Sequence, residues 1–278
     1  MQEHHIYWVA LNRVKGIGAV RLRALLDHFG DARAAWEAQP GALAAAGLTP
    51  LLIDSFVEVR SNLDLARLAE DLEKHQIQVL TWEDEAYPRR LADIDQAPPV
   101  LYVRGELQPD DEWAVAVVGT RRISRYGRQV AEELGAFLAH QGITVVSGLA
   151  RGVDDVAHQA ALNAGGRSLA VMAHGLDTVY PNEHRRLAER IMQQGALISD
   201  YGVDVPPDSR NFPPRNRIIS GLCIATVVEA GQTSGALITV DFAVEQGREV
   251  FMVPGNIYAP SSKGTNRYIQ QGAAAVDL

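Results

Sequence analysis

The sequence contains one cysteine, Cys223, among its 278 residues. A disulfide framework needs pairs of cysteines and a Cys-rich zinc site needs several, so both are excluded. No apolar run approaches the roughly 20 residues that a membrane-spanning helix needs, and the N-terminus, MQEHHIYWVA, lacks the basic start and apolar core of a signal peptide. We therefore expect a globular, cytoplasmic protein with no membrane partner and no metal site.

Lysine is also scarce. Lys15, Lys74 and Lys263 are three of the 26 basic residues, which leaves 23 arginines, and the net charge is −8. This charge excludes a protein coated in positive charge but not a local basic site, because the field in a cleft depends on its own lining. Arginine has a planar fork that suits phosphate and can stack on bases. A GC-rich genome would explain the same preference equally well, so the positions of the arginines must decide.

Residues 1–75 are rich in Ala and Leu at mixed three- and four-residue spacings, a pattern that favours helices. Glycine and proline interrupt the pattern and keep these helices short. We predict a small all-α domain over 1–75, of the helix-hairpin-helix (SAM-like) kind. The segment 76–113 contains two strand-like runs, 77–81 and 100–104. It either joins the two domains or extends the sheet of the second one.

A Gly-Ile-Gly sequence stands between the first two expected helices. Such a hairpin presents backbone N–H groups toward a phosphate and contacts the nucleic-acid backbone rather than the bases. An ordinary glycine-rich turn between two helices would have the same sequence. The residues that would make this secondary DNA contact are Lys15, Gly16, Gly18 and Arg21.

From Ala114 onward, short apolar runs alternate with helix-length stretches. Continuous apolar strands that alternate with helices predict an α/β domain whose mainly parallel sheet is covered on both faces. Right-handed crossovers then make the sheet doubly wound. We assign residues 76–278 to this second domain. The strand-like runs lie at 114–118, 143–147, 168–172, 196–199, 224–229 and 250–253.

The loops after these runs carry glycine and arginine, and ligands of doubly wound sheets bind beyond the carboxyl ends of the strands. Glycine lets the backbone approach an anion, and the following helix supplies free N–H groups. Gly148–Gly152 and Ser234–Gly235 therefore resemble phosphate cradles, although tight helix–strand packing also requires glycine. Phe212 among arginines adds a stacking surface, a combination expected for single-stranded nucleic acid, unless it is a core residue beneath its loop. The expected site residues are Gly119, Thr120, Arg121, Arg122, Ser147, Gly148, Arg151, Gly152, Arg210, Phe212, Arg215, Asn216, Arg217, Ser234 and Gly235.

The sequence shows no catalytic constellation. The sequence has no G-x-G-x-x-G motif after the first strand-like run, as a dinucleotide site would need. It also has no G-x-x-x-x-G-K-[ST] motif, which marks a Walker-type phosphate site. No serine lies on a G-x-S-x-G elbow. His158 and His174 are lone candidates for acid/base work, and Cys223 lies in an apolar stretch, as a buried inert thiol does. We expect no catalytic residue and no cofactor.

Taken in order, these motifs resemble the DNA-processing protein A (DprA/Smf) family. The resemblance is loose over the N-terminal helical domain and close over residues about 85–276, and Gly264-Thr265-Asn266 continues it. Six matches in order and spacing are highly specific. The matching stretches are 117–122 (VVGTRR), 146–158 (VSGLARGVDDVAH), 175–181 (GLDTVYP), 212–221 (FPPRNRIISG), 229–239 (EAGQTSGALIT) and 247–255 (GREVFMVPG).

The resemblance implies a protein, not an enzyme, that binds single-stranded DNA, protects it and helps to load the RecA recombinase during natural transformation. It also implies an extended Rossmann-like domain through which two copies form a homodimer, with a DNA pocket lined by the loops described above. Members often carry a C-terminal winged-helix domain, and because this sequence stops at Leu278 we expect that domain to be missing. Some relatives have a lysine just before F-P-x-R-N-R, where this sequence has Ser209-Arg210 and Arg210 is the candidate substitute.

Two other functions stay open. The same broad fold includes nucleotide-binding or nucleotide-hydrolysing enzymes that resemble the lysine-decarboxylase-like proteins, whose P-G-G-x-G-T-x-x-E loop supplies a catalytic glutamate. The corresponding loop here, 229–237, has no acid three residues past its final glycine, which counts against hydrolysis. A sensor of a small free nucleotide would share the phosphate loops, and the dependence of binding on ligand length would separate it from a DNA-binding protein.

Overall fold

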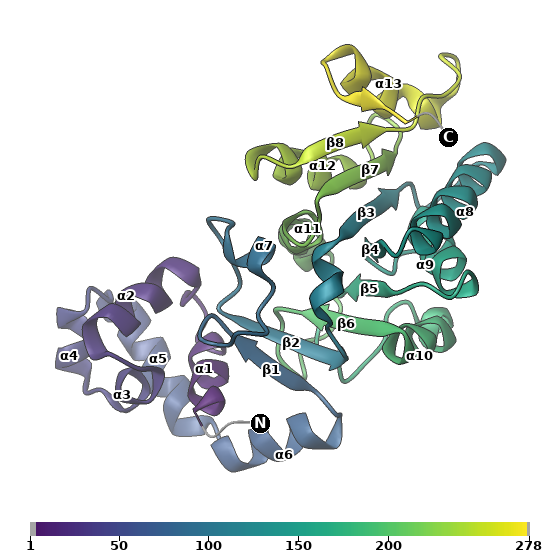
Figure 1. The fold of residues 1–278 in the computed structure, drawn as a ribbon. Helices are drawn as coiled ribbons and strands as arrows, with labels where there is room; N and C mark the ends of the chain where they lie inside the picture. Colours follow the sequence, from purple (N-terminus) through teal and green to yellow (C-terminus); the bar gives the residue numbers. More distant parts are fainter. Residues whose placement is uncertain (1–3, 277–278) are drawn as a thin grey trace.

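The structure is a computed structural model that describes residues 4–276, and within this range nine strands form one sheet (Figure 1). The strand order is β1-β2-β6-β5-β4-β3-β7-β8-β9. The strands are β1 (Gln78–Thr81), β2 (Val100–Gly105), β3 (Ala114–Gly119), β4 (Thr144–Ser147), β5 (Ser168–Val171), β6 (Gly195–Ser199), β7 (Ala225–Glu229), β8 (Glu249–Met252) and β9 (Ala274–Ala275).

The sheet is parallel from β6 to β9, whereas β1–β2 and β2–β6 are antiparallel pairs. From β3 the chain winds outward through β4, β5 and β6, and it then returns to the other side of β3 to form β7 and β8. The predicted mainly parallel, doubly wound sheet is therefore confirmed. The segment 76–113, which could have been a simple join, extends this sheet through β1 and β2.

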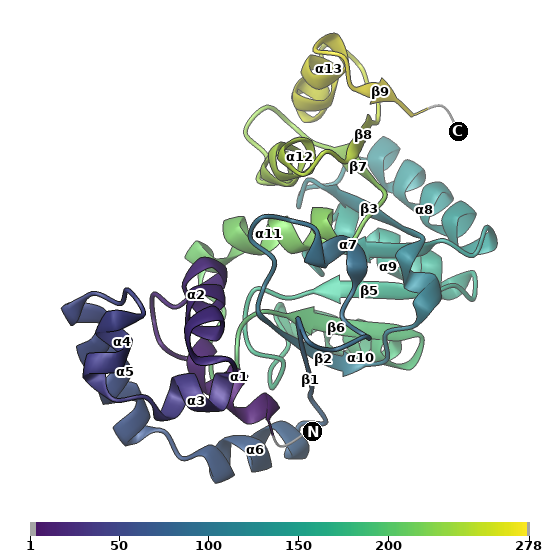
Figure 2. The ribbon, with the colours of Figure 1, turned by 60° about the vertical axis from the view of Figure 1, so that its left-hand side comes forward.

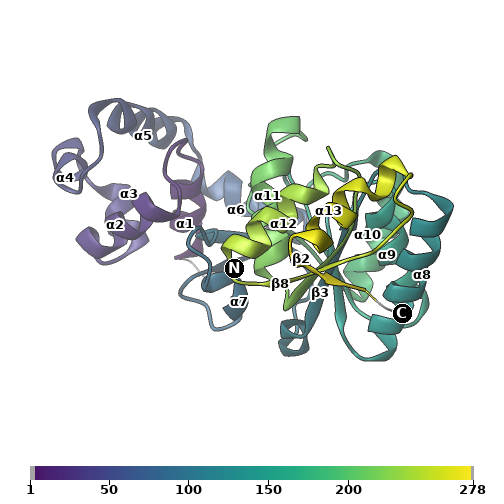
Figure 3. The same cartoon turned by 90° about the horizontal axis from the view of Figure 1, so that it is seen from above.

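Helices cover both faces of the sheet, as Figure 3 shows from above. Helices of the connections that lead from β3 through β4 and β5 to β6 cover the first face. Helices of the connections from β6 to β7 and from β7 to β8 lie on the second face. The first-face helices are α8 (Arg125–His140), α9 (Val153–Asn163) and α10 (Arg185–Gln193), and the second-face helices are α7 (Arg89–Ala92), α11 (Phe212–Gly221), α12 (Ala236–Glu245) and α13 (Lys263–Gln270). Short 3-10 turns lie at η1 (Pro109–Glu112), η2 (Asn182–His184), η3 (Ser209–Asn211) and η4 (Pro260–Ser262).

The N-terminal part is all helical, as predicted. The side chain of Asp31 accepts a hydrogen bond at the start of α3, and that of Asp64 does so at the start of α6. Pro40 and Pro50 stand in the first turns of α4 and α5, where a missing N–H costs nothing. The helices are α1 (His5–Asn12), α2 (Ala19–Phe29), α3 (Ala32–Glu37), α4 (Pro40–Ala45), α5 (Pro50–Asn62) and α6 (Leu65–Lys74).

These helices pack against the β1–β2 side of the sheet (Figure 2). Trp8 and Leu11 of α1 are buried in one cluster with Tyr102 of β2. The Arg13 guanidinium donates a 2.6 Å hydrogen bond to the carbonyl oxygen of Val203. The two parts therefore share a core and a polar contact. The expected domain boundary after residue 75 falls between α6 and β1. That residues 1–75 and 76–278 are separate domains stays a prediction.

A helix that spans a membrane must be both long and apolar. Within residues 4–276, no helix is long and apolar enough to span a bilayer.

Candidate nucleic-acid interface

A pocket of about 640 Å³ lies at the carboxyl ends of β3 and β7, where the winding direction of the chain reverses. Doubly wound sheets bind their ligands at such a switch point. The loop after β3, the loop after β7, η4 and the start of α11 line the pocket. It brings together nine of the predicted site residues: Gly119, Thr120, Arg121, Arg122, Phe212, Arg215, Asn216, Ser234 and Gly235.

Arg121 and Arg122 are the exposed cations of this pocket. The guanidinium carbon of Arg121 lies 5.3 Å from the centroid of the Phe212 ring. In the described part of the chain, no carboxylate forms an ion pair with either arginine. Two guanidinium charges without an ion-pair partner among the described residues, next to an aromatic ring, suit a ligand with both phosphate and base.

The turn that carries these arginines is fixed to β7. The backbone N–H of Thr120 donates to the carbonyl oxygen of Glu229 over 2.9 Å. A Cβ atom at Gly119 would lie 2.4 Å from that same oxygen and 2.5 Å from a Val153 methyl group, so the close approach requires glycine. The strand-to-helix connection thus holds the two arginines at the mouth of the pocket.

The Gly148–Gly152 loop, expected to cradle a phosphate, already holds an internal anion. The Asp154 carboxylate accepts hydrogen bonds from the backbone N–H groups of Gly148 (3.1 Å) and Ala150 (3.3 Å). Asp154 is buried, and burial raises the pKa of its carboxyl group. These two N–H groups are therefore satisfied inside the protein. Asp154 holds the loop in place, and neither N–H group is free to bind a phosphate.

Arg215 is a buried cation in the pocket lining. Its guanidinium donates to the carbonyl oxygens of Val171 and Gly148 and, over 3.2 Å, to the Asn216 side chain. Burial lowers the pKa of Arg215 to about 10, and the nearby Asp154 charge partly offsets this effect. Arg215 also lies 5.9 Å from the Phe212 ring centroid, so two guanidinium groups, those of Arg121 and Arg215, are close to this ring.

The other six predicted site residues lie outside the pocket lining, and Arg217 is one of them. Ser147 is buried and donates to the Val117 carbonyl oxygen. Gly152 has a φ of +91°, and a Cβ atom there would collide with the Thr120 carbonyl oxygen. Arg151 and Arg210 are exposed at the rim, where each pairs with a carboxylate, Glu183 at 2.5 Å and Asp208 at 2.6 Å. With Gly148, these residues shape or surround the pocket, and their contact with DNA stays a prediction.

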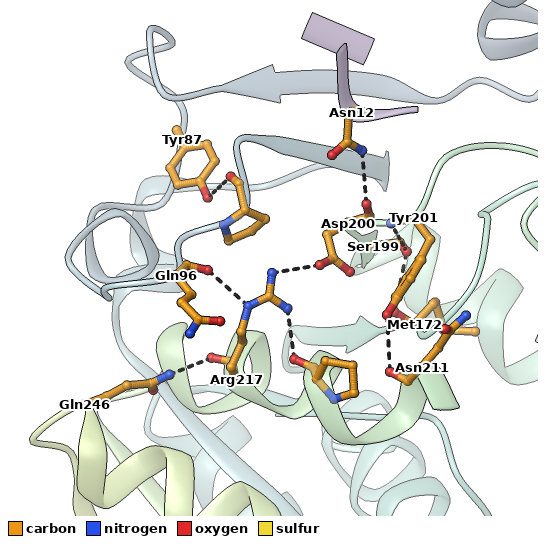
Figure 4. Close-up of polar contacts among 12 residues, drawn as sticks. Asn12, Tyr87, Gln96, Met172, Ser199, Asp200, Tyr201, Asn211, Arg217 and Gln246 are labelled. Atoms are coloured by element: carbon orange, nitrogen blue, oxygen red, sulfur yellow. Dashed lines mark hydrogen bonds and ion pairs between the residues drawn. The ribbon is translucent and has the colours of Figure 1, made fainter. Parts of the chain in front are cut away.

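Arg217 has three protein acceptors (Figure 4). Its guanidinium donates to the Gln96 carbonyl oxygen (3.0 Å), the Pro214 carbonyl oxygen (2.9 Å) and the Asp200 carboxylate (2.8 Å). Its side chain is 14% exposed. Although it stands two residues after Arg215 in sequence, Arg217 joins α11 to two loops, and its contact with DNA stays a prediction.

The N-terminal hairpin has the expected shape. Gly16 has a φ of +99°, and Gly18 stands at the start of α2. Arg21 donates a 2.7 Å hydrogen bond back to the Gly16 carbonyl oxygen, whereas Lys15 is exposed. Arg21 therefore stabilises the turn, and Lys15 is the side chain best placed for the predicted secondary DNA contact.

The candidate catalytic groups are buried among protein partners. The His158 ring contacts Ser168 Oγ at 2.7 Å, and burial lowers the pKa of His158 to about 3. The His174 ring contacts the Gly175 carbonyl oxygen at 2.8 Å. The Cys223 thiol donates to Ile219, and burial raises its pKa. Over residues 4–276, no cluster of three or more metal-ligating side chains is found.

Three side chains of this region were not among the predicted site residues: Asp154, Tyr180 and Asp200. Asp154 lies close to Arg215, and Asp200 lies close to Arg217, but the members of each pair are far apart in sequence. Tyr180 could have been found from its place in the loop after β5, at the carboxyl edge of the sheet.

The comparisons with known proteins agree with this arrangement. A family model described as DNA recombination-mediator protein A matches residues 78–277, and one described as a DprA-like N-terminal HHH domain matches residues 2–64. The chain is 39% identical over 276 residues to the protein Smf of Synechocystis sp., with 97% of this chain and 69% of that protein aligned.

Two solved structures are also similar. DNA processing protein A from Streptococcus pneumoniae superimposes with a TM-score of 0.85 and 34% identity, covering 99% of this chain and 95% of the other. The second is DNA processing protein A from Helicobacter pylori, whose structure is described as showing its single-stranded DNA binding mode. It superimposes with a TM-score of 0.66 and 28% identity, covering 73% of this chain and 93% of the other. The chain belongs to the DNA recombination-mediator protein A (DprA/Smf) family.

Proposed function

We propose that this protein binds single-stranded DNA in the pocket between β3 and β7. The observation that carries the proposal is the group of Arg121, Arg122 and Phe212 at the mouth of that pocket. In a chain with a net charge of −8, two arginines that pair with no carboxylate of residues 4–276 are a local basic site on an otherwise acidic protein. Such a site attracts a polyanion even where the protein as a whole does not.

The chemistry favours single strands without sequence preference. Arginine binds phosphate through charge-assisted hydrogen bonds, and every base offers a face that can stack on an aromatic ring. In a duplex the bases are already stacked on one another, so Phe212 would have no free base to receive. The Helicobacter pylori relative, described as binding single-stranded DNA, supports the same function here.

We further propose that the protein protects incoming single-stranded DNA and loads the RecA recombinase onto it during natural transformation, as a homodimer in the cytoplasm. This part rests on membership of the family. Its test is the rate at which RecA assembles on single-stranded DNA with and without the protein. An increase in this rate supports loading, and an unchanged or lower rate contradicts it.

The pocket also favours binding over hydrolysis. Asp154 is the acidic side chain among its described lining residues, and the hydrogen bonds from the Gly148–Ala150 backbone engage it. The Glu229 carboxylate lies buried against Gly127 and does not line the pocket. Hydrolysis of a glycosidic bond would need a carboxyl group in contact with substrate. We therefore propose that the protein acts by binding and not as an enzyme.

The direct test is a fluorescence-anisotropy titration with labelled oligothymidylate of several lengths, in single-stranded and duplex form, beside a mononucleotide. Binding that strengthens with length and prefers the single strand supports the proposal. Equal affinity for the mononucleotide and the oligonucleotides would contradict it and would support the small-nucleotide sensor.

A further inference from the structure

Tyr180 is an exposed aromatic residue beside the pocket that the proposed function does not use. It lies in the loop between β5 and η2, at the same carboxyl edge of the sheet. Its ring centroid is 6.1 Å from that of Phe212, with the two ring planes inclined by 44°. The side chain is 45% exposed. The two rings are tilted and do not stack on one another, and nearly half of Tyr180 is exposed, so part of its ring surface is open to solvent.

His174 supports the Tyr180 ring from within the protein. The two ring centroids are 6.4 Å apart and the planes meet at 88°, an edge-to-face contact. His174 is buried and is itself held by the Gly175 carbonyl oxygen. Edge-to-face packing of this kind favours a defined ring orientation. Tyr180 is thus oriented by a buried partner, which distinguishes it from an aromatic side chain that moves freely on the surface.

The strand order gives Tyr180 a direction relative to the pocket. The pocket lies between β3 and β7, and β4 and β5 follow on the other side of β3. Arg121 after β3, Phe212 at the start of α11 and Tyr180 after β5 therefore form a row along the edge of the sheet, with neighbours 5.3 Å and 6.1 Å apart. The row leads away from the pocket toward β6 and the N-terminal helices.

A charge accompanies this row. Arg151, in the loop after β4, pairs at 2.5 Å with Glu183 of η2, the turn that directly follows the loop carrying Tyr180. Both members of this pair are exposed, with side chains 64% and 49% accessible. An exposed ion pair contributes little to stability and exchanges partners readily. A DNA phosphate next to Tyr180 can therefore replace Glu183 as the partner of Arg151.

We propose that Tyr180 is a second base-stacking subsite, which receives the base next to the one on Phe212, with Arg151 as its phosphate contact. This inference rests on the proposed single-stranded DNA binding and adds the course of the strand: from the pocket past Phe212 and toward the N-terminal domain. A free mononucleotide fills the Phe212 subsite alone and does not reach Tyr180.

The test compares Tyr180→Leu, which keeps apolar volume but removes the aromatic face, with Tyr180→Phe, which keeps the face. Oligothymidylates that carry one 2-aminopurine report stacking as quenched fluorescence. We expect Tyr180→Leu to weaken binding of long oligonucleotides by about 5- to 100-fold and to abolish quenching at one position of the strand. Tyr180→Phe is expected to retain both. Phe137→Ala removes another exposed ring, on α8, and serves as the control.

A second variant tests the phosphate contact with the opposite sign. Glu183→Gln frees Arg151, so we expect tighter binding of long oligonucleotides and no change for the mononucleotide. If Tyr180→Leu and Glu183→Gln both bind every length as the wild type does, the Tyr180 subsite is wrong. In that case Phe212→Ala still weakens binding if the proposed function holds. If the wild-type protein binds no oligonucleotide at all, both proposals fail.

Discussion

The Arg217 guanidinium and the Asp200 carboxylate form a 2.8 Å ion pair between α11 and the loop after β6, and both side chains are about 15% exposed. Asp200 also accepts a hydrogen bond, through its carbonyl oxygen, from the Asn12 side chain of α1. Gln246, next to the end of α12, donates to the carbonyl oxygen of Arg217. The pair therefore lies where the N-terminal helices, α11 and α12 meet (Figure 4).

Arg217→Ala should lower the stability of the protein. The substitution removes three hydrogen bonds and leaves Asp200 largely buried without its partner, so we expect the free energy of unfolding to fall by about 2 to 4 kcal/mol. Chemical denaturation measures this change. Arg210→Ala, which removes an exposed pair with Asp208, is the matched control and should leave the denaturation midpoint unchanged. Equal midpoints for Arg217→Ala and the wild type would refute the structural role.

The sheet could be predicted from the sequence more completely than the site, and Arg215 and Arg217 show the reason. Apolar runs such as 114–118 and 143–147 predict strands because the signal lies within each run. Whether an arginine is free or neutralised depends instead on a residue far away in the chain. Arg215 meets Gly148, 67 positions away, and Arg217 meets Asp200, 17 positions away, because the fold brings these segments together. Arg121 and Arg122 follow a strand directly, and their place at the pocket could be predicted.

Some local features could also not be predicted for physical reasons. The Gly148–Gly152 motif indicates a tight strand-to-helix turn whether its N–H groups face a ligand or a side chain, and here Asp154 accepts two of them. The short strand β9 contains only Ala274–Ala275, too few residues for a periodic pattern. The strands β1 and β2 were expected, but their antiparallel pairing depends on contacts between segments.

Gly148→Ala should disturb the buried cation. A Cβ atom at this position would lie 2.6 Å from a terminal nitrogen of Arg215 and 3.0 Å from the Asp154 carboxylate. Both groups are buried and engaged in hydrogen bonds, so the collision is expected to lower the free energy of unfolding by about 1 to 3 kcal/mol. Thermal denaturation measures the effect. Gly142→Ala, where no atom lies within 4 Å but φ is +70°, is a control for backbone strain alone.

Acid should destabilise the protein through His158. Burial lowers its pKa from 6.5 to about 3 in the folded state, so below pH 6.5 the unfolded state binds the proton more readily. The stability that neutral His158 supports is present above pH 6.5 and is lost progressively as the pH falls toward 3. We expect His158→Gln to lose stability less steeply over this range. An identical slope in the two proteins, measured by denaturation at each pH, would exclude this contribution.

Salt should weaken binding strongly. Each phosphate contact in a single strand contributes a slope of about 0.7 to the fall of log affinity with log salt concentration. Arg122→Ala removes one exposed cation of the pocket, so the slope should fall by about that amount. Arg128→Ala, on α8 and paired with Glu132, should leave the slope unchanged. A slope near zero for the wild-type protein would contradict an arginine-lined DNA site.

The affinity of Arg121→Ala for single-stranded oligothymidylate, relative to the wild type and to Arg128→Ala, tests the central claim most directly. Arg121 lies over Phe212 at the mouth of the pocket and has no carboxylate partner within residues 4–276. Loss of its phosphate contact should weaken binding by about 1 to 3 kcal/mol, with the denaturation midpoint unchanged and Arg128→Ala equal to the wild type. Wild-type affinity in Arg121→Ala would place the DNA elsewhere on the protein.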